Sequence, residues 1–272
     1  MRRPIVVGVD GSPGSLAATR YAAYLALRCA APLRLLHVFE SMFYGYGPLP
    51  ITADYAVTDA QVRKAAAAWL DETAEEIRAA HPDLTVATEM QDGFVAATLI
   101  AESQEALVTV VGSRGTGGFS GLLLGSVSAQ LAASGHGPIV VARPILHPSG
   151  PVVVGYDGSG AARAALDYGV AEALAQGKPL VVATVYGDQP LQAESLLAEG
   201  VEEHVRAHPE LSVETRTILS HNEEQALTEA VARASLAVVG CRGRGGFTGL
   251  VLGSVSQALV HHAACPVAVI HL

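Results

Sequence analysis

The chain contains two copies of one sequence pattern, and this internal repeat constrains its fold more than any other feature. The stretch PIVVGVDGS at residues 4–12 returns as PVVVGYDGS 147 residues later. A glycine-rich stretch at residues 112–128 returns 128 residues later with four changes among 17 positions. Two copies are too few for a solenoid. The sequence therefore predicts two tandem modules, with domains at residues 1–146 and 147–272.

The first copy carries an insertion, because the spacing between the copies falls from 147 to 128 residues along the chain. The extra residues lie between Val38 and His81. The aromatic residues, glycines and prolines at 40–59 predict an irregular loop there. Three interpretations stay open: a lid over a site in the first module, a patch that binds a partner, or a loop packed on its own module.

Each copy alternates strand-like and helix-like segments. In the first copy, apolar runs with β-branched residues predict strands, and alanine-rich segments predict helices. The expected strands are residues 4–10, 32–39, 85–91, 107–112 and 138–142, and the expected helices are 15–30, 59–80, 94–105 and 125–133. This alternation predicts an α/β fold with a parallel sheet covered on both faces. Ligands of such sheets bind beyond the carboxyl ends of the strands.

Composition excludes several classes of function. A net charge of −9 without a basic run argues against nucleic-acid binding, and no apolar run is long enough to cross a bilayer. Three scattered cysteines argue against a disulfide framework and a zinc site. The basic start enters a strand directly, unlike a signal peptide. We therefore expect a cytoplasmic protein that binds neither nucleic acid nor membranes.

Each copy places a glycine-rich loop between a buried strand and a helix. Glycines at 112 and 115 let the backbone turn tightly and approach a ligand closely. Amide donors at the start of the next helix, near Gly125 and Ser126, favour a phosphate, and Arg114 adds a cation. Two alternatives stay open: Ser126 caps the helix or binds a phosphate oxygen, and the glycines serve a ligand or only the turns.

The spacing G-x2-G-x9-G-[S/T] after a strand, in a chain with VGVDGS near its start, resembles the ATP-binding class of the universal stress protein family. The motif is complete in both copies: Gly112, Gly115, Gly125 and Ser126, then Gly240, Gly243, Gly253 and Ser254. The resemblance implies two Rossmann-like modules, each a five-stranded parallel sheet of order 3-2-1-4-5 flanked by helices. It also implies one ATP per module, accompanied by Mg²⁺ that the phosphates mainly hold, with no metal ligand expected from the protein.

The resemblance further assigns site residues, position by position. The residues expected at the adenosine end are Asp10 and Val38 in the first copy and Asp157 and Val185 in the second. Those expected at the ribose are Val111 and Gly112, and Val239 and Gly240. Those expected at the phosphates are Arg114, Gly115, Gly125, Ser126 and Val127, and Arg242, Gly243, Gly253, Ser254 and Val255. Since Thr116 becomes Arg244, we expect the second site to hold phosphates more tightly.

No nucleophile, base and orienting residue can be assembled from the sequence, so we expect no enzyme beyond weak ATP hydrolysis. His37 and Asp10 end neighbouring strands and are expected close together, but Thr184 replaces His37 in the second copy. The leading hypothesis is a nucleotide-dependent regulator of a stress response. The alternatives are a slow ATPase or nucleotidyl-transfer enzyme, and a dimerisation scaffold with vestigial sites.

The resemblance implies an intramolecular pseudo-dimer through the last strands, residues 138–142 and 266–270. A homodimer of such tandems is also open, as is an unknown protein partner. The adjacent His261 and His262 point in different directions on a helix, which argues against a metal site with Cys265.

Overall fold

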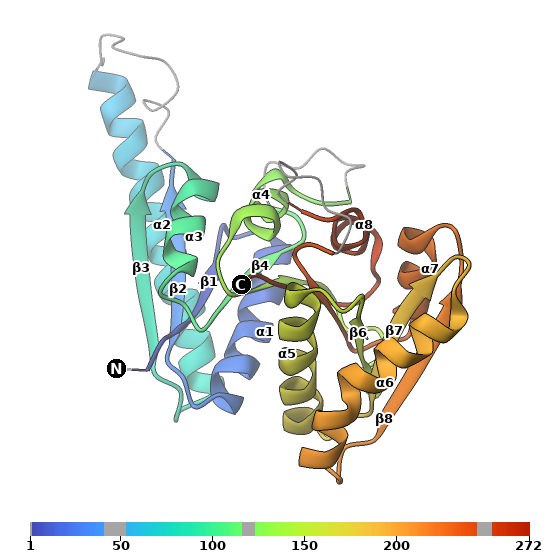
Figure 1. Cartoon of the computed structure of the whole chain (residues 1–272). Helices are drawn as coiled ribbons and strands as arrows, with labels where there is room; N and C mark the ends of the chain where they lie inside the picture. Colours follow the sequence, from blue (N-terminus) through green and yellow to red (C-terminus); the bar gives the residue numbers. More distant parts are fainter. Residues whose placement is uncertain (1, 41–52, 116–122, 244–251) are drawn as a thin grey trace. The chain divides into compact units, whose positions relative to one another are not determined.

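A computed structural model describes residues 2–40, 53–115, 123–243 and 252–272, with side chains from residue 60 onward in the second stretch. Strands and helices alternate in both repeats (Figure 1). The first repeat contains β1 (Ile5–Gly8), α1 (Pro13–Arg28), β2 (Leu33–Phe39), α2 (Ala53–Ala80), β3 (Val86–Asp92), α3 (Val95–Ser103), β4 (Val108–Gly112), α4 (Ser126–Ser134) and β5 (Pro138–Ala142). The second contains β6 (Val152–Gly155), α5 (Gly160–Gln176), β7 (Leu180–Tyr186), α6 (Pro190–Ala207), β8 (Val213–Leu219), α7 (Glu223–Ala230), β9 (Leu236–Gly240), α8 (Ser254–His262) and β10 (Val267–Ile270).

The chain divides into two compact units, Met1–Leu131 and Ala132–Leu272. In the first unit the strand order is β3-β2-β1-β4, and every pair is parallel. In the second, β8-β7-β6-β9-β10 is the predicted order 3-2-1-4-5, again with parallel pairs. The predicted fold class, two tandem modules of this α/β type, is confirmed. The domain boundary at residues 146/147 stays a prediction. The division into compact units falls earlier in the chain, between residues 131 and 132 of α4.

The last strands of the two repeats pair with each other. β5 runs antiparallel to β10, from Val267 opposite Val141 to Ile270 opposite Pro138. This pairing confirms the expected intramolecular pseudo-dimer.

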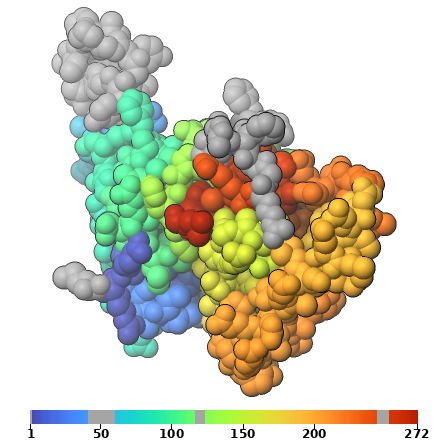
Figure 2. All heavy atoms as spheres, in the orientation of Figure 1, coloured from blue at the N-terminus to red at the C-terminus, as the bar shows by residue number. Residues whose placement is uncertain are grey.

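Two reciprocal contacts flank the pair of last strands. Arg143, which follows β5, donates to the Val260 carbonyl in α8. His271, which follows β10, has its Nε2 3.0 Å from the Ala132 carbonyl in α4. In the space-filling view the end of the chain lies beside α5 (Figure 2).

The central strands of each unit are buried along their length. In β1, Ile5, Val6 and Val7 are fully buried, and every residue of β4 and β9 is buried. A parallel strand reads as a continuous apolar run only when both of its faces are covered. The helix order and this burial together leave the carboxyl ends of the strands, where the glycine loops begin, as the place for a ligand.

One predicted loop is shorter than expected. The structure places Ala53–Asp59 in α2, so the prediction of an irregular loop over all of 40–59 is wrong for this part. The reason is local: the last proline of the insertion is Pro50, and nothing after it prevents the helix from extending backward. The rest of the insertion, at 41–52, lies outside the described residues, as do Thr116 and Arg244.

Candidate functional site

The glycine loop of the second module lies very close to its neighbours at two of its glycines. A Cβ on Gly240 would come within 2.6 Å of the Ala161 backbone at the start of α5. A Cβ on Gly243 would come within 2.5 Å of the Asp157 carboxylate. Real Cβ atoms do not approach other atoms this closely, so backbone packing requires glycine at 240, and a side chain at 243 would displace the Asp157 carboxylate. These two glycines therefore allow close packing as well as the turn.

The first module repeats these close approaches. A Cβ on Gly112 would come within 2.6 Å of the Gly14 backbone in α1, and a Cβ on Gly115 would collide with the Asp10 carboxylate. The predicted residues Asp10 and Gly115 are therefore adjacent in space, as are Asp157 and Gly243. The structure thus brings together residues 105 positions apart in the first module and 86 positions apart in the second.

A serine in each module joins the glycine loop to the first helix. Ser12 caps α1 by accepting from the Ser15 amide at 3.1 Å, and its hydroxyl donates to the Arg114 carbonyl at 3.3 Å. Ser159 makes the same two bonds in the second module, at 3.1 Å from the Ala162 amide and 3.3 Å to the Arg242 carbonyl.

The aspartates fold back on the same turns. Asp10 Oδ1 accepts from the Ser12 amide and Asp157 Oδ1 from the Ser159 amide, both at 3.0 Å. Serine is therefore the cap of the first helix in both modules, while the aspartate carboxylate is held against the glycine loop. His37 Nδ1 lies 2.7 Å from the carbonyl of Val9, the residue before Asp10, and the expected closeness of His37 to Asp10 itself stays a prediction.

The start of α8 faces this loop without a side-chain cap. Among the described residues, the N-cap is Gly253, with φ −68° and ψ 153°, and no side chain accepts from the first turn. Ser254 is the first helical residue, so its hydroxyl is not the cap. The Gly253 amide donates to the Cys241 carbonyl at 2.8 Å, which closes the loop. An N-terminal turn with amides of this kind suits an anion.

A second serine fixes each of the last helices to its strand. Ser256 Oγ donates to the Gly240 carbonyl at 2.7 Å, and Ser128 Oγ to the Gly112 carbonyl at 2.6 Å. This pair of serines was not predicted from the sequence. Their signal was present, because both serines sit in the repeated GSVS segment.

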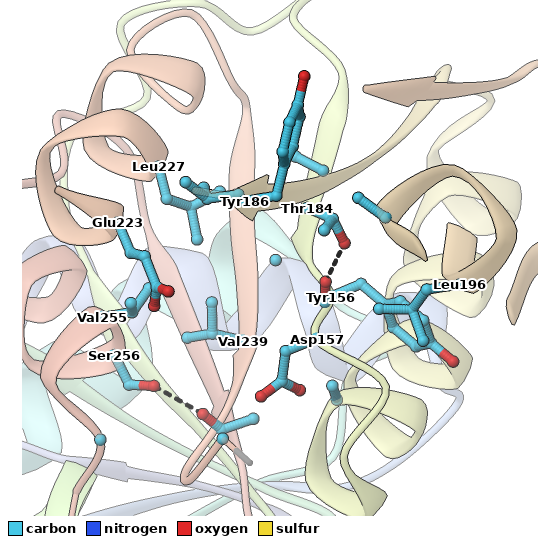
Figure 3. A pocket seen from close by; sticks show the side chains of 18 of the residues that line it. Tyr156, Asp157, Thr184, Tyr186, Leu196, Glu223, Leu227, Val239, Val255 and Ser256 are labelled. Carbon is cyan, nitrogen blue, oxygen red and sulfur yellow. Dashed lines mark hydrogen bonds between the residues drawn. The ribbon is translucent and has the colours of Figure 1, made fainter. Parts of the chain in front are cut away.

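A cavity of about 890 Å³ opens at the carboxyl ends of β6, β7 and β9 (Figure 3). This volume falls in the range of small-molecule sites, about 300–1,000 Å³. Every residue predicted for the second site lines it: Asp157, Val185, Val239, Gly240, Arg242, Gly243, Gly253, Ser254 and Val255. The lining residues that sequence reasoning missed include Tyr156, Thr184, Leu196, Glu223, Leu227 and Ser256.

The first module brings its own predicted residues to the matching places. Val38 is in β2, Val111 and Gly112 end β4, and Ser126 and Val127 begin α4. The Gly125 amide donates to the Ser113 carbonyl at 2.8 Å, as Gly253 does to Cys241. Arg114 contributes its carbonyl to the bond with Ser12, so its backbone position is fixed by α1.

The wall under the second strand differs between the modules. In the second module, the Thr184 hydroxyl donates to the Tyr156 carbonyl (Figure 3). At the equivalent place in the first module, the His37 ring nitrogen Nδ1 lies against the Val9 carbonyl. Tyr156 is 5% exposed, and its ring lies next to α6. A Cβ on Gly200 would come within 2.7 Å of that ring, so α6 approaches only because residue 200 is glycine.

In the first module, α2 supplies the bulk at this wall. The Trp69 ring meets the His37 ring edge to face, with centroids 5.2 Å apart. Trp69 also lies under the first turn, 3.7 Å from where a Cβ on Gly11 would stand. The residue of the first module at the position of Tyr156 is the smaller Val9.

Among the described residues, no group of three histidine, cysteine or acidic side chains is placed to hold a metal ion. The rings of His261 and His262 lie with centroids 6.0 Å apart, and burial lowers the pKa of His261. Burial raises the pKa of the Cys265 thiol to about 11, which disfavours the thiolate that a metal needs. Within the same described part of the chain, no helix is apolar and long enough to cross a membrane.

Comparisons with known proteins agree with this geometry. Residues 1–143 and 149–271 each match the universal stress protein family. A universal stress protein of Mycolicibacterium smegmatis is 36% identical over 293 aligned positions, covering 98% of this chain and 96% of that protein. A crystal structure of a universal stress protein from Archaeoglobus fulgidus has a TM-score of 0.76 at 22% identity, with 99% of both chains covered, which supports the fold.

A shorter universal stress protein, solved in complex with cAMP, is 30% identical and covers 45% of this chain and 97% of its own. Its TM-score against the whole chain is 0.39, so the ligand of that protein carries no argument here. The two family matches and the relative with 36% identity establish the family without it. The chain belongs to the universal stress protein family and contains two of its modules in tandem.

Proposed function

We propose that each module binds one ATP with Mg²⁺, and that the chain acts as a nucleotide-dependent regulator in a stress response. The observation that carries this proposal is the cavity of the second module, lined by all nine residues that the motif resemblance assigns. The matched contacts of the first module extend the proposal to both sites. A cytoplasmic location is part of the proposal and is supported by the scattered cysteines.

The lining suits a nucleotide in two respects. At one end, Gly243 and Gly253 leave backbone accessible, Arg242 adds a cation, and the uncapped start of α8 presents amides. At the other end, Val185 and Val239 provide apolar surface next to Asp157. Phosphates would bind at the first end and adenosine at the second. Mg²⁺, when bound with the phosphates, would neutralise part of their charge.

The described part of the cavity favours binding over catalysis. Its charged side chains are Asp157, Asp188, Glu223 and Arg242, and neither histidine nor lysine lines it. The Asp157 carboxylate is packed against the glycine loop and holds the turn before α5. A carboxylate used in this way is poorly suited to activate water. Fast hydrolysis is therefore not part of the proposal.

Titration calorimetry with Mg²⁺-ATP tests the proposal, together with an assay for ADP production in the same sample. We expect two ATP bound per chain and turnover no faster than the uncatalysed background. Absence of binding would contradict the proposal and leave a dimerisation scaffold. Turnover that disappears in Asp157→Asn or Glu223→Gln would instead favour the slow-ATPase alternative.

A further inference from the structure

One carboxylate in the cavity of the second module has no counterpart in the first. Glu223 is the first residue of α7, and its side chain extends toward Val239 and Val255 (Figure 3). The helix α3 of the first module begins at Val95 in the equivalent position. The two modules therefore differ by a charged hydrogen-bond acceptor within otherwise similar glycine-loop sites.

The packing of α7 fixes where this carboxylate points. Leu227, one turn later on the same helix face, is 4% exposed and packs over Gly155, where an added Cβ would come within 2.6 Å of it. In α3, Leu99 occupies the same position over Gly8 and is 2% exposed. The spacing from Val95 to Leu99 equals that from Glu223 to Leu227. Residue 223 is thus directed over the sheet edge by a buried anchor.

An alternative explanation for Glu223 is stabilisation of the helix dipole, since acidic residues favour a first turn. Glu224 provides the same charge in the same turn, and the Asn222 side chain already caps the Gln225 amide at 3.0 Å. Glu224 does not line the nucleotide cavity, whereas Glu223 does. The dipole thus accounts for an acid in this turn but not for its position in the cavity.

The chemistry of a nucleotide limits what this carboxylate can bind. Phosphates repel it, and an ionised carboxylate only accepts hydrogen bonds. The donors of ATP are the adenine amino group and the ribose hydroxyls. Because Glu223 extends toward Val239, which the motif resemblance assigns to the ribose, the ribose hydroxyls are the donors that it faces. Resting on that proposed function, we propose that Glu223 makes the second site selective for ribonucleotides, while the first site lacks this selectivity.

The test compares ATP with 2′,3′-dideoxyadenosine triphosphate at the second site, in full-length protein whose first site is blocked by Gly125→Glu. We expect the dideoxy analogue to bind about tenfold or more weakly, because a charged acceptor loses its hydrogen-bond donor. Glu223→Val, which installs the residue of the first module, should bring the two affinities within about twofold. Glu224→Val is the matched control and should keep the full difference.

The outcomes separate the two proposals. If ATP binds but Glu223→Val keeps the discrimination, the role of Glu223 is wrong and the proposed function stands. If ATP does not bind to the unmodified protein, both fail. If Glu223→Val weakens ATP only when Mg²⁺ is present and not in EDTA, the carboxylate serves the cation and the ribose assignment is overturned.

Discussion

The two modules hold their glycine loops alike but fill the space at the second strand differently. The serine cap, the aspartate turn and the loop closure recur with distances that agree within 0.1 Å. Beside them, the first module packs Trp69 of α2 against His37, and the second packs Tyr156 against Gly200 of α6. The large side chain therefore comes from a helix in the first module and from the end of a strand in the second.

The comparison teaches which part of the site tolerates change. The glycine loop depends on backbone positions and on hydrogen bonds between fixed groups, and a Cβ on Gly112, Gly115, Gly240 or Gly243 would come within 2.6 Å of a neighbouring atom. The wall depends on filled volume, which different residues can supply as long as the total is kept. A site for phosphates is therefore expected to stay constant between repeats, while the wall next to it diverges.

The largest expected effect comes from blocking one loop at a time. A Cβ on Gly253 or Gly125 would have only ordinary contacts, at 3.5 Å or more, unlike one on Gly240 or Gly112. Gly253→Glu should therefore fold and weaken nucleotide binding at the second site by about a hundredfold or more, because its carboxylate repels phosphate. Calorimetry should then show one ATP per chain, and Gly125→Glu should do the same for the first site. Two full sites in either variant would contradict the matched assignment, and Gly253→Gln separates charge from bulk.

A smaller effect is expected at the divergent wall. Gly200→Ala normally favours a helix, but here its methyl meets the Tyr156 ring, so we expect a loss of about 1–3 kcal/mol in the free energy of unfolding. Tyr156→Val, as in the first module, should relieve the clash, so that Gly200→Ala costs less in that background. Chemical denaturation of the four proteins measures the coupling. If Gly200→Ala stabilised the otherwise unmodified chain, the close packing of Tyr156 against Gly200 would be contradicted.

The serine caps should differ modestly between modules. Ser12→Ala and Ser159→Ala each remove an N-cap and a bond to the glycine loop, at a cost of about 0.5–2 kcal/mol. Ser12 is buried, at 6% exposed, whereas Ser159 is partly exposed, so the loss should be larger for Ser12→Ala. Thermal unfolding of both variants provides the comparison. Equal losses would show that burial of the cap does not matter here.

The smallest expected effect concerns the residues after the last strands, where Arg143 and His271 occupy equivalent places. Burial lowers the pKa of His271 below its usual value, although the bond to the Ala132 carbonyl opposes the shift. The unfolded chain therefore binds this proton more readily. Its contribution to stability is present above about pH 6.5 and is lost as the pH falls through that value toward the folded-state pKa. His271→Gln should flatten this part of the stability profile, and an unchanged profile would contradict it.

Much of the fold was predictable from sequence because its signals are local or repeated. The buried valine runs gave the strands, and the change in repeat spacing located the insertion. The glycine spacing indicated the loop that the structure places at the cavity, since the two copies share it almost unchanged. The start of α2 was misjudged because aromatic residues near Tyr55 looked like loop while the sequence after Pro50 can extend a helix.

The rest of the site depends on contacts that sequence spacing does not reveal. Tyr156 and Gly200 lie 44 positions apart, and their dependence on each other appears only when α6 is placed on the sheet. In the sequence, Glu223 is an ordinary acidic residue in the first turn of a helix. Its direction follows only from the burial of Leu227 on the same face of that helix. Thr184 and His37 are different residues, yet each side chain lies against the carbonyl of the residue that follows the neighbouring strand. This similarity follows from strand register.

The most direct test of the central claim is to denature the purified protein and identify the released nucleotide by chromatography and mass spectrometry, with its molar ratio. The account predicts ATP, approaching two molecules per chain in the unmodified protein and one in Gly253→Glu. Release of no nucleotide, followed by no binding of added Mg²⁺-ATP, would contradict it.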